Sequence, residues 1–476
     1  YKTPPKPTNT TPRYHRPMTK AQRWGFFAVV SLGLLMIGLD NSILYTALPA
    51  LERSLGANPS EGLWIINAYP LALSGLLLGT GTLGDRVGHR KMFLIGLAIF
   101  GAASLAAAFA PGTGELIAAR ALLGVGAAVM MPATLALIRL TFPDERERNT
   151  AIGIWGAVAV VGGALGPVVG GALLEHFWVG SVFLINVPIV AAAIVLTFML
   201  APPNMPDPGK SWDVISSVYS LIALAGLTMA IKQTANTQST KLLVASVVAC
   251  VVGAWLFVRR QARLEDPLLT FDIFRSRMFT GGVLAAAGGM FVMAGAELMT
   301  TQKLQLIDDF TPLKAGTTVA AMALAAIPAS TLGGAFLHKI GFMPLISGGF
   351  AAAVVGALVL RIGASQQSIA LEVAALALLG LATGSVMSVS SIAIIGAAPM
   401  NRSGMAAGVE EVSYEFGTLT TVALTGSLLQ RGLNNGATYT DAYVNVLVVI
   451  AIGAAALCLA TVWCFRGNPK SGGALA

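Results

Sequence analysis

Four carboxylates stand inside apolar stretches that are long enough to cross a lipid bilayer. Asp40 lies in the middle of residues 32–49, an otherwise apolar run. A second group, Glu410, Glu411 and Glu415, falls within a later run. A carboxylate at mid-bilayer depth costs about 2.5–3.5 kcal/mol on insertion scales, so such acids face water or an internal partner. Their chemistry would be the binding of protons or of cations.

Asp40 is predicted to bind a proton or a cation in a transport pathway. The alternative is a cap on a helix that stops early, because Asn41 and Ser42 follow and Pro49 could end the segment. A charged cap at this depth would be as costly as the exposed backbone that it covers, which favours the binding site.

The later acids are arranged by helical spacing. Glu411 and Glu415 are four residues apart and share a helix face, whereas Glu410 lies about 100° round and is expected to pair with Tyr414. Glu410 alone would suit the first turn of a cytosolic helix, but Glu415 falls about 10–20 Å into the membrane at 1.5 Å per residue. Crowded carboxylates repel, so at least one is expected to hold a proton near neutral pH. Exchange of that proton for an organic cation would leave the local charge unchanged.

A cation is also expected at the depth of Asp40. Arg120 lies inside a span, about 10 Å from the outer surface, and an arginine there needs an acidic or carbonyl partner. The two residues are therefore a candidate pair for proton coupling. The alternative is that Arg120 extends its guanidinium to the outer interface.

Composition places the chain in the membrane. Of 476 residues, 55% are hydrophobic and only 11% are charged, whereas soluble domains have about 25% charged residues. The 53 glycines suit close packing of helices in lipid. The net charge of +8 is spread over short loops, so it indicates topology rather than nucleic-acid binding. Long apolar runs predict an all-α polytopic fold.

Fourteen spans of roughly 20–25 residues are predicted. They lie near 24–50, 61–82, 91–110, 114–138, 149–174, 179–201, 213–232, 241–259, 278–303, 313–337, 342–362, 368–396, 404–430 and 442–465. With the N-terminus in the cytosol, about 22 of the 30 Lys and Arg residues fall on the cytosolic side. An even number of spans returns the C-terminus to that side.

An internal repeat divides the chain. Glycines seven residues apart recur at Gly81 and Gly88 and again at Gly334 and Gly341, and the fifth and thirteenth predicted spans align at an offset of about 255 residues. In this register Glu297 takes roughly the place of Asp40. Two homologous halves flank an inserted pair of helices. The predicted parts are a cytosolic tail 1–23, a six-helix bundle 24–201, the inserted pair with its flanking loops 202–277, a second six-helix bundle 278–465 and a cytosolic tail 466–476.

Four motifs carry a family resemblance. The loop with Gly81, Gly84, Asp85, Arg86, Gly88 and Arg90 resembles the loop signature of the major facilitator superfamily. The segment from Arg120 to Ala128 resembles that family's fourth-helix motif. The fifth-helix motif of its proton antiporters is matched by Gly162, Gly166, Pro167, Gly170 and Gly171. The run from Leu39 to Pro49 is similar to the first-helix motif of its fourteen-span drug:proton antiporters.

The resemblance covers residues 24–465 and implies a fold of two six-helix bundles plus two inserted helices. It implies a proton-coupled multidrug efflux antiporter of the bacterial inner membrane, which is no enzyme, needs no cofactor and no metal, and works as a monomer. Its partners would be protons, membrane lipid and lipophilic cations: quaternary ammonium biocides, dyes, viologens and biguanides. In the loop signature, Asp85 and Arg86 would latch the halves in one state; the alternative is a simple charged loop.

Aromatic and methionine side chains are candidates for the walls of a cation pocket. They are Tyr45, Trp64, Tyr69, Trp155, Tyr414, Phe416, Met130 and Met131. The alternative, which a single aromatic residue in a membrane helix favours, is a packing or interface residue. The alternative function is a proton-coupled metabolite transporter of the same fold, against which the fifth-helix motif and the acids of 404–430 argue.

Overall fold

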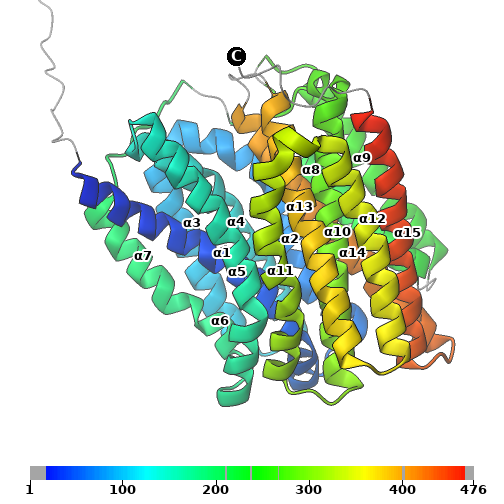
Figure 1. Ribbon diagram of the computed structural model, residues 1–476. Coiled ribbons are helices and arrows are strands. Elements are labelled where there is room, and N and C mark those ends of the chain that lie inside the picture. The colour runs from blue at the N-terminus through cyan, green and yellow to red at the C-terminus, as the bar shows by residue number, and fades with distance from the viewer. Residues whose placement is uncertain (1–17, 210–211, 236–238, 266, 399–402, 467–476) are drawn as a thin grey trace, which may run out of the picture.

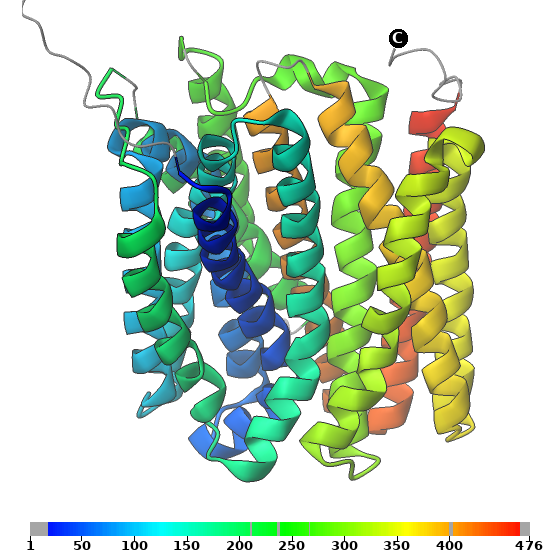
Figure 2. The ribbon, with the colours of Figure 1, turned by 60° about the vertical axis from the view of Figure 1, so that its left-hand side comes forward.

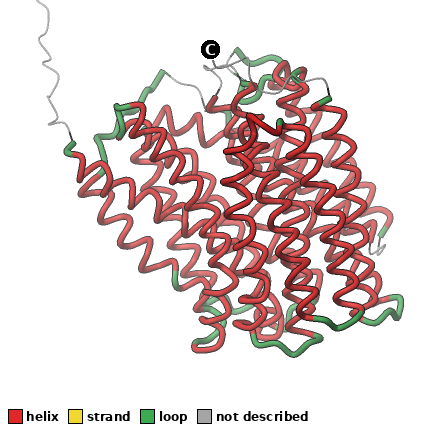
Figure 3. Tube along the Cα trace, in the orientation of Figure 1, coloured by secondary structure: helices red, strands yellow, loops and turns green. Residues whose placement is uncertain are grey.

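The structure is a computed structural model that describes residues 18–209, 212–235, 239–265, 267–398 and 403–466. Every regular element in these residues is a helix (Figure 3). Residues 1–17 and 467–476, which make up most of the two predicted tails, lie outside the described residues.

The first half of the chain folds into five long helices and one broken helix. Its elements are α1 (Lys20–Leu55), α2 (Pro59–Val87), α3 (His89–Ala108), α4 (Thr113–Thr141), α5 (Glu145–His176), α6 (Ser181–Leu184) and α7 (Asn186–Leu200). Local sequence sets the ends of α1: Thr19 and Gln22 form a capping box, and Gly56 terminates the helix in the left-handed region. The predicted sixth span is thus two helices that meet at Ile185.

The inserted pair consists of α8 (Val214–Ala235) and α9 (Thr240–Gln261), followed by the short 3-10 helix η1 (Phe271–Arg275). The two helices pack closely because glycines face the neighbouring backbone; a Cβ on Gly253 would lie 2.7 Å from the Ala223 nitrogen. Helix α8 contacts both α2 and α14, so the pair touches both halves through this helix.

The second half contains α10 (Arg277–Leu306), α11 (Pro312–Ile340), α12 (Phe342–Ser365), α13 (Ile369–Ala397), α14 (Ser403–Asn434) and α15 (Tyr439–Phe465). In Figures 1 and 2 the helices of the first half, coloured blue through cyan to green, stand beside those of the second half, coloured green through yellow to red. Helix α1 begins and α15 ends on the same face of the bundle (Figure 1), which is called the N-face below. The other end is called the far face.

Twelve helices of the described residues are long and apolar enough to cross a membrane, with α6 and α7 counted as one. The other two predicted spans correspond to α5 and α14, which have 32 residues each. Helix α14 carries three glutamates in the first half of its sequence. Because 32 residues rise about 48 Å, either helix has the length to cross.

The repeat is visible in the backbone conformation of two matching glycines. Gly88 and Gly341 both have positive φ, 97° and 93°, and each is the single turn residue between two helices. The loop predicted for residues 81–91 is therefore wrong in extent: Gly81 and Gly84 are helical, since α2 continues to Val87. The division into two bundles and an inserted pair accords with this repeat and stays a prediction.

The two halves meet closely toward the far face. Helix α5 packs on α11, where Gly171 lies against Leu313, and α14 packs on α2, where Gly426 lies against Leu63. These two contacts occupy corresponding positions in the repeat. Gln305 of α10 also donates to the Thr46 carbonyl of α1 at 2.9 Å. A cavity of about 520 Å³, the N-face cavity, lies between the halves toward the other end.

Candidate functional site

Asp40 is buried in the first half, where it pairs with Arg120. The two residues come from α1 and α4, and their exposed fractions are 2% and 0%. Arg120 donates from Nη1 to Asp40 Oδ2 at 2.6 Å and from Nε to the Ile65 carbonyl of α2 at 3.1 Å. The predicted contact is confirmed, and Arg120 does not extend to the interface. A buried ion pair of this kind needs further hydrogen bonds to offset its desolvation.

Asn186 supplies one of those bonds, and the sequence reasoning missed it. It is the first residue of α7, and its Nδ2 donates to Asp40 Oδ1 at 2.8 Å and to Ser104 Oγ at 3.3 Å. Both oxygens of Asp40 are thus engaged. An asparagine inside the apolar span 179–201 was the available signal, because a buried amide in a membrane helix needs a partner.

Asp40 does not border the N-face cavity. The ring of Tyr69 lies 4.7 Å from the Arg120 guanidinium carbon, so an aromatic face covers the pair. Arg120 Nη2 is buried and has no hydrogen-bond partner in the part of the chain that the structure describes. Asp40 therefore faces an internal partner rather than water in this conformation.

The acids of α14 lie between the cavity and that pair. Glu411 borders the N-face cavity. One turn deeper, Glu415 is 8% exposed, and its Oε2 has no hydrogen-bond partner among the described residues. Glu415 lies close enough to Arg120 for the guanidinium charge to attract its carboxylate. An acid of the second half is therefore near the Asp40–Arg120 ion pair of the first half.

Glu410 behaves as its spacing predicted. The Tyr414 hydroxyl donates to Glu410 Oε1 at 2.7 Å, one helical turn away. This bond is confirmed, and it separates Glu410 from the other two acids of α14.

Glu297 of α10 is another buried acid of the second half, with 7% exposure. No hydrogen bond to its carboxylate is present among the residues that the structure describes. Both Glu297 and Glu415 lie within electrostatic range of the Tyr45 hydroxyl of α1. The three residues are therefore in one region between the halves.

The N-face cavity is the space nearest to these acids. It is bordered by residues of α2, α3, α4, α5 and α14 and of the segment before η1: Leu77, Leu78, Gly81, Thr82, Asp85, His89, Met131, Pro132, Leu135, Ala136, Arg139, Leu140, Trp155, Pro267, Leu268, Met405, Ala407, Gly408 and Glu411. Of the predicted pocket walls, Trp155 and Met131 lie here. The Trp155 indole donates to Thr134 Oγ1 at 3.1 Å, which fixes its ring.

The other predicted wall residues do not gather around this cavity. Met130 points to a different side of α4 and packs against Gly96 of α3. Phe416 has 36% exposure. Trp64 lies in a separate cavity near the far face. Helical rotation explains the first two, because neighbouring residues of a helix point about 100° apart.

The loop signature forms a tight corner within the first half. Asn204 donates to the Val87 carbonyl at 2.8 Å and accepts from the Lys91 nitrogen at 3.1 Å, which fills the space left by Gly88. Asp85 Oδ1 lies 3.1 Å from His89 Nε2. Arg90 donates to the Phe198 carbonyl at 3.3 Å, and Arg86 is exposed. The predicted latch across the halves stays a prediction.

The fifth-helix motif lies where three helices converge. Gly162, Gly166 and Gly170 face α1, and Gly171 and Pro167 face α11. A Cβ on Gly162 would lie 2.8 Å from a backbone carbonyl oxygen of α1. The motif therefore holds α5 against the helix that carries Asp40 and against the other half.

This architecture and site are those of a transporter. Residues 30–363 match the family model of the major facilitator superfamily, and the chain belongs to that superfamily. Its members are transporters and not enzymes.

Individual relatives are more specific. The methyl viologen resistance protein SmvA of Salmonella typhimurium is 36% identical over 419 residues, which are 87% of this chain and 84% of that protein. The multidrug efflux pump LfrA of Mycolicibacterium smegmatis is 37% identical over 423 residues, 88% of this chain and 82% of the pump.

A solved structure supports the fold alone. The bacterial homologue of the human lysosomal transporter Spinster, in its inward-facing conformation, matches with a TM-score of 0.66 and 16% identity. The match covers 95% of this chain and 100% of that chain.

Proposed function

We propose that this protein is a proton-coupled multidrug efflux antiporter of the bacterial inner membrane, with both termini in the cytosol. In that orientation the N-face is cytosolic. Two relatives at 36–37% identity are named for methyl viologen resistance and for multidrug efflux. Methyl viologen is a dication, so the proposed substrates are lipophilic cations.

The observation that carries the proposal is the position of the acids on α14. Glu411 borders the N-face cavity, and Glu415 lies one turn deeper with one oxygen that has no hydrogen-bond partner in the described part of the chain. A bulky cation that enters from the cytosol would reach Glu411 first, between Trp155 and Met131. Aromatic faces stabilise such cations by about 0.5–2 kcal/mol, and methionine adapts to varied shapes.

Proton coupling would act through Arg120. Asp40 and Glu415 are both within the influence of this guanidinium, so protonation of one acid frees Arg120 to interact more strongly with the other. A proton that arrives from outside and neutralises Glu415 would release the bound cation. The proton gradient alone drives this cycle, without a cofactor, in a single copy of the chain.

The close contacts near the far face and the cavity near the N-face fit an inward-open state. During transport the α5–α11 and α2–α14 contacts would separate at the far face while the cavity closes. Rocking of two repeats about a central site is the common mechanism of such folds.

A transport assay tests the proposal. The purified chain in liposomes should expel ethidium and methyl viologen only when a pH gradient is imposed, and each export event should move protons the other way. Transport of the cations that is unaffected when the gradient is collapsed contradicts proton coupling. Uptake of a metabolite instead of cation export would favour the alternative transporter of the same fold.

A further inference from the structure

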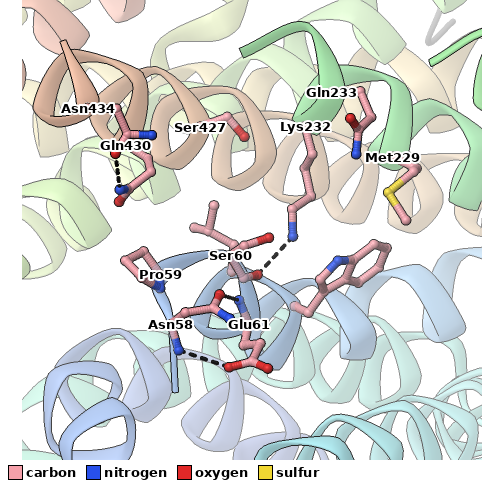
Figure 4. A pocket seen from close by; sticks show the side chains of 12 residues that line it. Asn58, Pro59, Ser60, Glu61, Met229, Lys232, Gln233, Ser427, Gln430 and Asn434 are labelled. Carbon is pink, nitrogen blue, oxygen red and sulfur yellow. Dashed lines mark hydrogen bonds between the residues drawn. The ribbon is translucent and has the colours of Figure 1, made fainter. Parts of the chain in front are cut away.

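A second cavity, of about 420 Å³, lies near the far face where three parts of the chain meet (Figure 4). It is formed by the first turns of α2, the last turns of α8 and the last turns of α14. We call it the far-face cavity. Most of the residues that line it are polar or charged, and amide and hydroxyl side chains come from all three parts: Asn58, Ser60, Gln233, Ser427, Gln430 and Asn434.

Lys232 is the charged group that defines this cavity. It sits in the last turn of α8, is 6% exposed, and donates from Nζ to the Ser60 carbonyl at 2.9 Å. The ammonium also lies 4.5 Å from the centre of the Trp64 ring. No carboxylate of the described residues is within ion-pair distance of Lys232. A buried ammonium without a counter-charge is costly, so an anion in the adjoining space would be stabilised.

Glu61 also borders the cavity but is engaged elsewhere. Its carboxylate accepts from the Asn58 nitrogen at 2.9 Å as part of the capping box of α2. It also lies at the positive end of that helix, which stabilises the charge there. The ammonium of Lys232 and the acid of Glu61 therefore have separate partners (Figure 4).

The far-face cavity is unsuited to the cations proposed as substrates. Lys232 occupies a face of Trp64, the aromatic surface that a cation would use, and its own charge repels a second cation. Trp64 is thus better explained as a partner of Lys232 than as a wall of the transport pathway.

The position of the far-face cavity along the helices indicates which kind of anion could bind there. All three helices begin or end beside the cavity, which places it at the depth of lipid headgroups rather than of acyl chains. After its bond to the Ser60 carbonyl, Lys232 has two donors left. The Gln430 amide nitrogen, which gives one hydrogen to Asn434, and the Gln233 amide add donors nearby. A phosphate group has several acceptor oxygens that match such a set.

We propose that the far-face cavity binds the phosphate of a phospholipid headgroup from the outer leaflet, with Lys232 as its main contact. The bound lipid joins α8 of the inserted pair to α2 of the first half and α14 of the second. This gives the inserted helices a role that a twelve-helix transporter lacks: a lipid-binding wall at the junction of the moving halves.

Binding is measured on the full chain purified in detergent. Short-chain probes, dihexanoyl-phosphatidylethanolamine and dihexanoyl-phosphatidylglycerol, are titrated while the melting temperature and the lipid adducts in native mass spectra are followed. Dihexanoylglycerol, which lacks the phosphate, and inorganic phosphate are titrated separately. We expect both phospholipids to bind, at least tenfold more tightly than either control compound.

Three variants assign the binding to Lys232. Lys232→Gln should weaken phospholipid binding at least tenfold, and Lys232→Arg, which keeps the charge, should remain within about threefold of wild type. Lys241→Gln is the matched control, because Lys241 is an exposed lysine in the first turn of α9 and borders no part of the cavity. It should bind lipid as wild type does.

Equal phospholipid binding by wild type and Lys232→Gln would overturn the proposal. So would dihexanoylglycerol binding as tightly as the phospholipids, since the phosphate would then contribute nothing. Inorganic phosphate binding as tightly as the lipids would assign the site to a free anion instead. None of these measurements depends on transport, so the outcome is independent of the proposed efflux.

Discussion

The two halves of this transporter treat corresponding acids in opposite ways. Asp40 of α1 and Glu297 of α10 are 257 residues apart (297 − 40 = 257) and occupy matching places in the repeat. Asp40 is held by Arg120 and Asn186. The carboxylate of Glu297 has no hydrogen bond among the described residues, and Glu415 of the same half keeps an unpaired oxygen.

We interpret this difference in terms of the proposed cation antiport, which must combine two tasks. In that proposal the first half would hold a neutralised charge that changes only by exchange of a proton or of a partner. Glu297, Glu411 and Glu415 of the second half would present charge to a mobile cation. Divergence of the halves in chemistry, on a shared backbone plan, is what the repeat by itself did not reveal.

Loss of the stored charge should have the largest effect. Asp40→Asn leaves Arg120 buried without its counter-charge, and breaking a buried pair in this way costs about 3–5 kcal/mol. We expect export of every cationic substrate to fall at least a hundredfold, measured as uptake of ethidium and methyl viologen into inverted vesicles.

The double variant Asp40→Asn/Arg120→Gln is the control for folding. It removes both charges, so its melting temperature should recover most of the loss seen with Asp40→Asn, while export stays absent. Normal export by Asp40→Asn would show that transport does not need the charge of Asp40.

Removal of one of the acids of α14 should have a smaller and more selective effect on export. Glu411→Gln takes away a charge that borders the N-face cavity. Export of dications should fall about tenfold, which corresponds to about 1.4 kcal/mol. Export of monocations should fall threefold or less, because one remaining acid can neutralise a single charge.

Glu410→Gln is the matched control, since Glu410 is the adjacent residue and is already bound by Tyr414. It should alter dication and monocation export equally little. An equal loss of both substrate classes in Glu411→Gln would refute the assignment of substrate charge to the second half.

Weakening the support of Asp40 tests how firmly the first half must hold its acid. Asn186→Ala removes the donor to Asp40 Oδ1 and leaves that oxygen buried, at a cost of about 1–3 kcal/mol. Because Arg120 remains, we expect export to fall only about threefold, with a displaced pH optimum. Asn186→Asp, which turns the donor into a second acid, should be more harmful. An unchanged pH profile in Asn186→Ala would mean that Asn186 only packs.

Much of this arrangement was predictable from the sequence, for identifiable reasons. Acids and an arginine in apolar runs are so costly that their burial and pairing follow from depth alone, as with Asp40 and Arg120. Helical spacing gave the Glu410–Tyr414 bond. The glycine repeat located the matching turns at Gly88 and Gly341. These are local or one-dimensional properties of the chain.

Other features depend on rotation and packing that the sequence does not specify. Met130 and Met131 are adjacent, yet only Met131 borders the cavity. Asn186 joins Asp40 because α6 and α7 break at Ile185, and no motif marked that break. Trp64 could not be separated from the pathway until Lys232 of the inserted pair was found beside its ring.

The smallest effect on export is expected from an ion pair of the inserted helices, which contacts neither Asp40 nor the acids of α14. Asp213 precedes α8 and accepts from Arg260 Nε at 2.9 Å and from Ser216. Burial raises the pKa of Asp213, but the hydrogen bonds from Ser216 and the Arg260 guanidinium outweigh it and hold the pKa below its ordinary value. The stabilisation is therefore present above about pH 4 and is lost as the pH falls through the lower folded value.

Asp213→Asn should lower stability by about 0.5–1 kcal/mol at pH 7, as partly exposed pairs do, and the difference from wild type should shrink below about pH 4. Melting temperatures at pH 7 and at pH 3.5 measure both effects. Export should remain within twofold of wild type at every pH, because this pair belongs neither to the stored charge nor to the mobile one. A large loss of export would mean that the inserted pair takes part in coupling. The comparison of the two halves alone would then not account for transport.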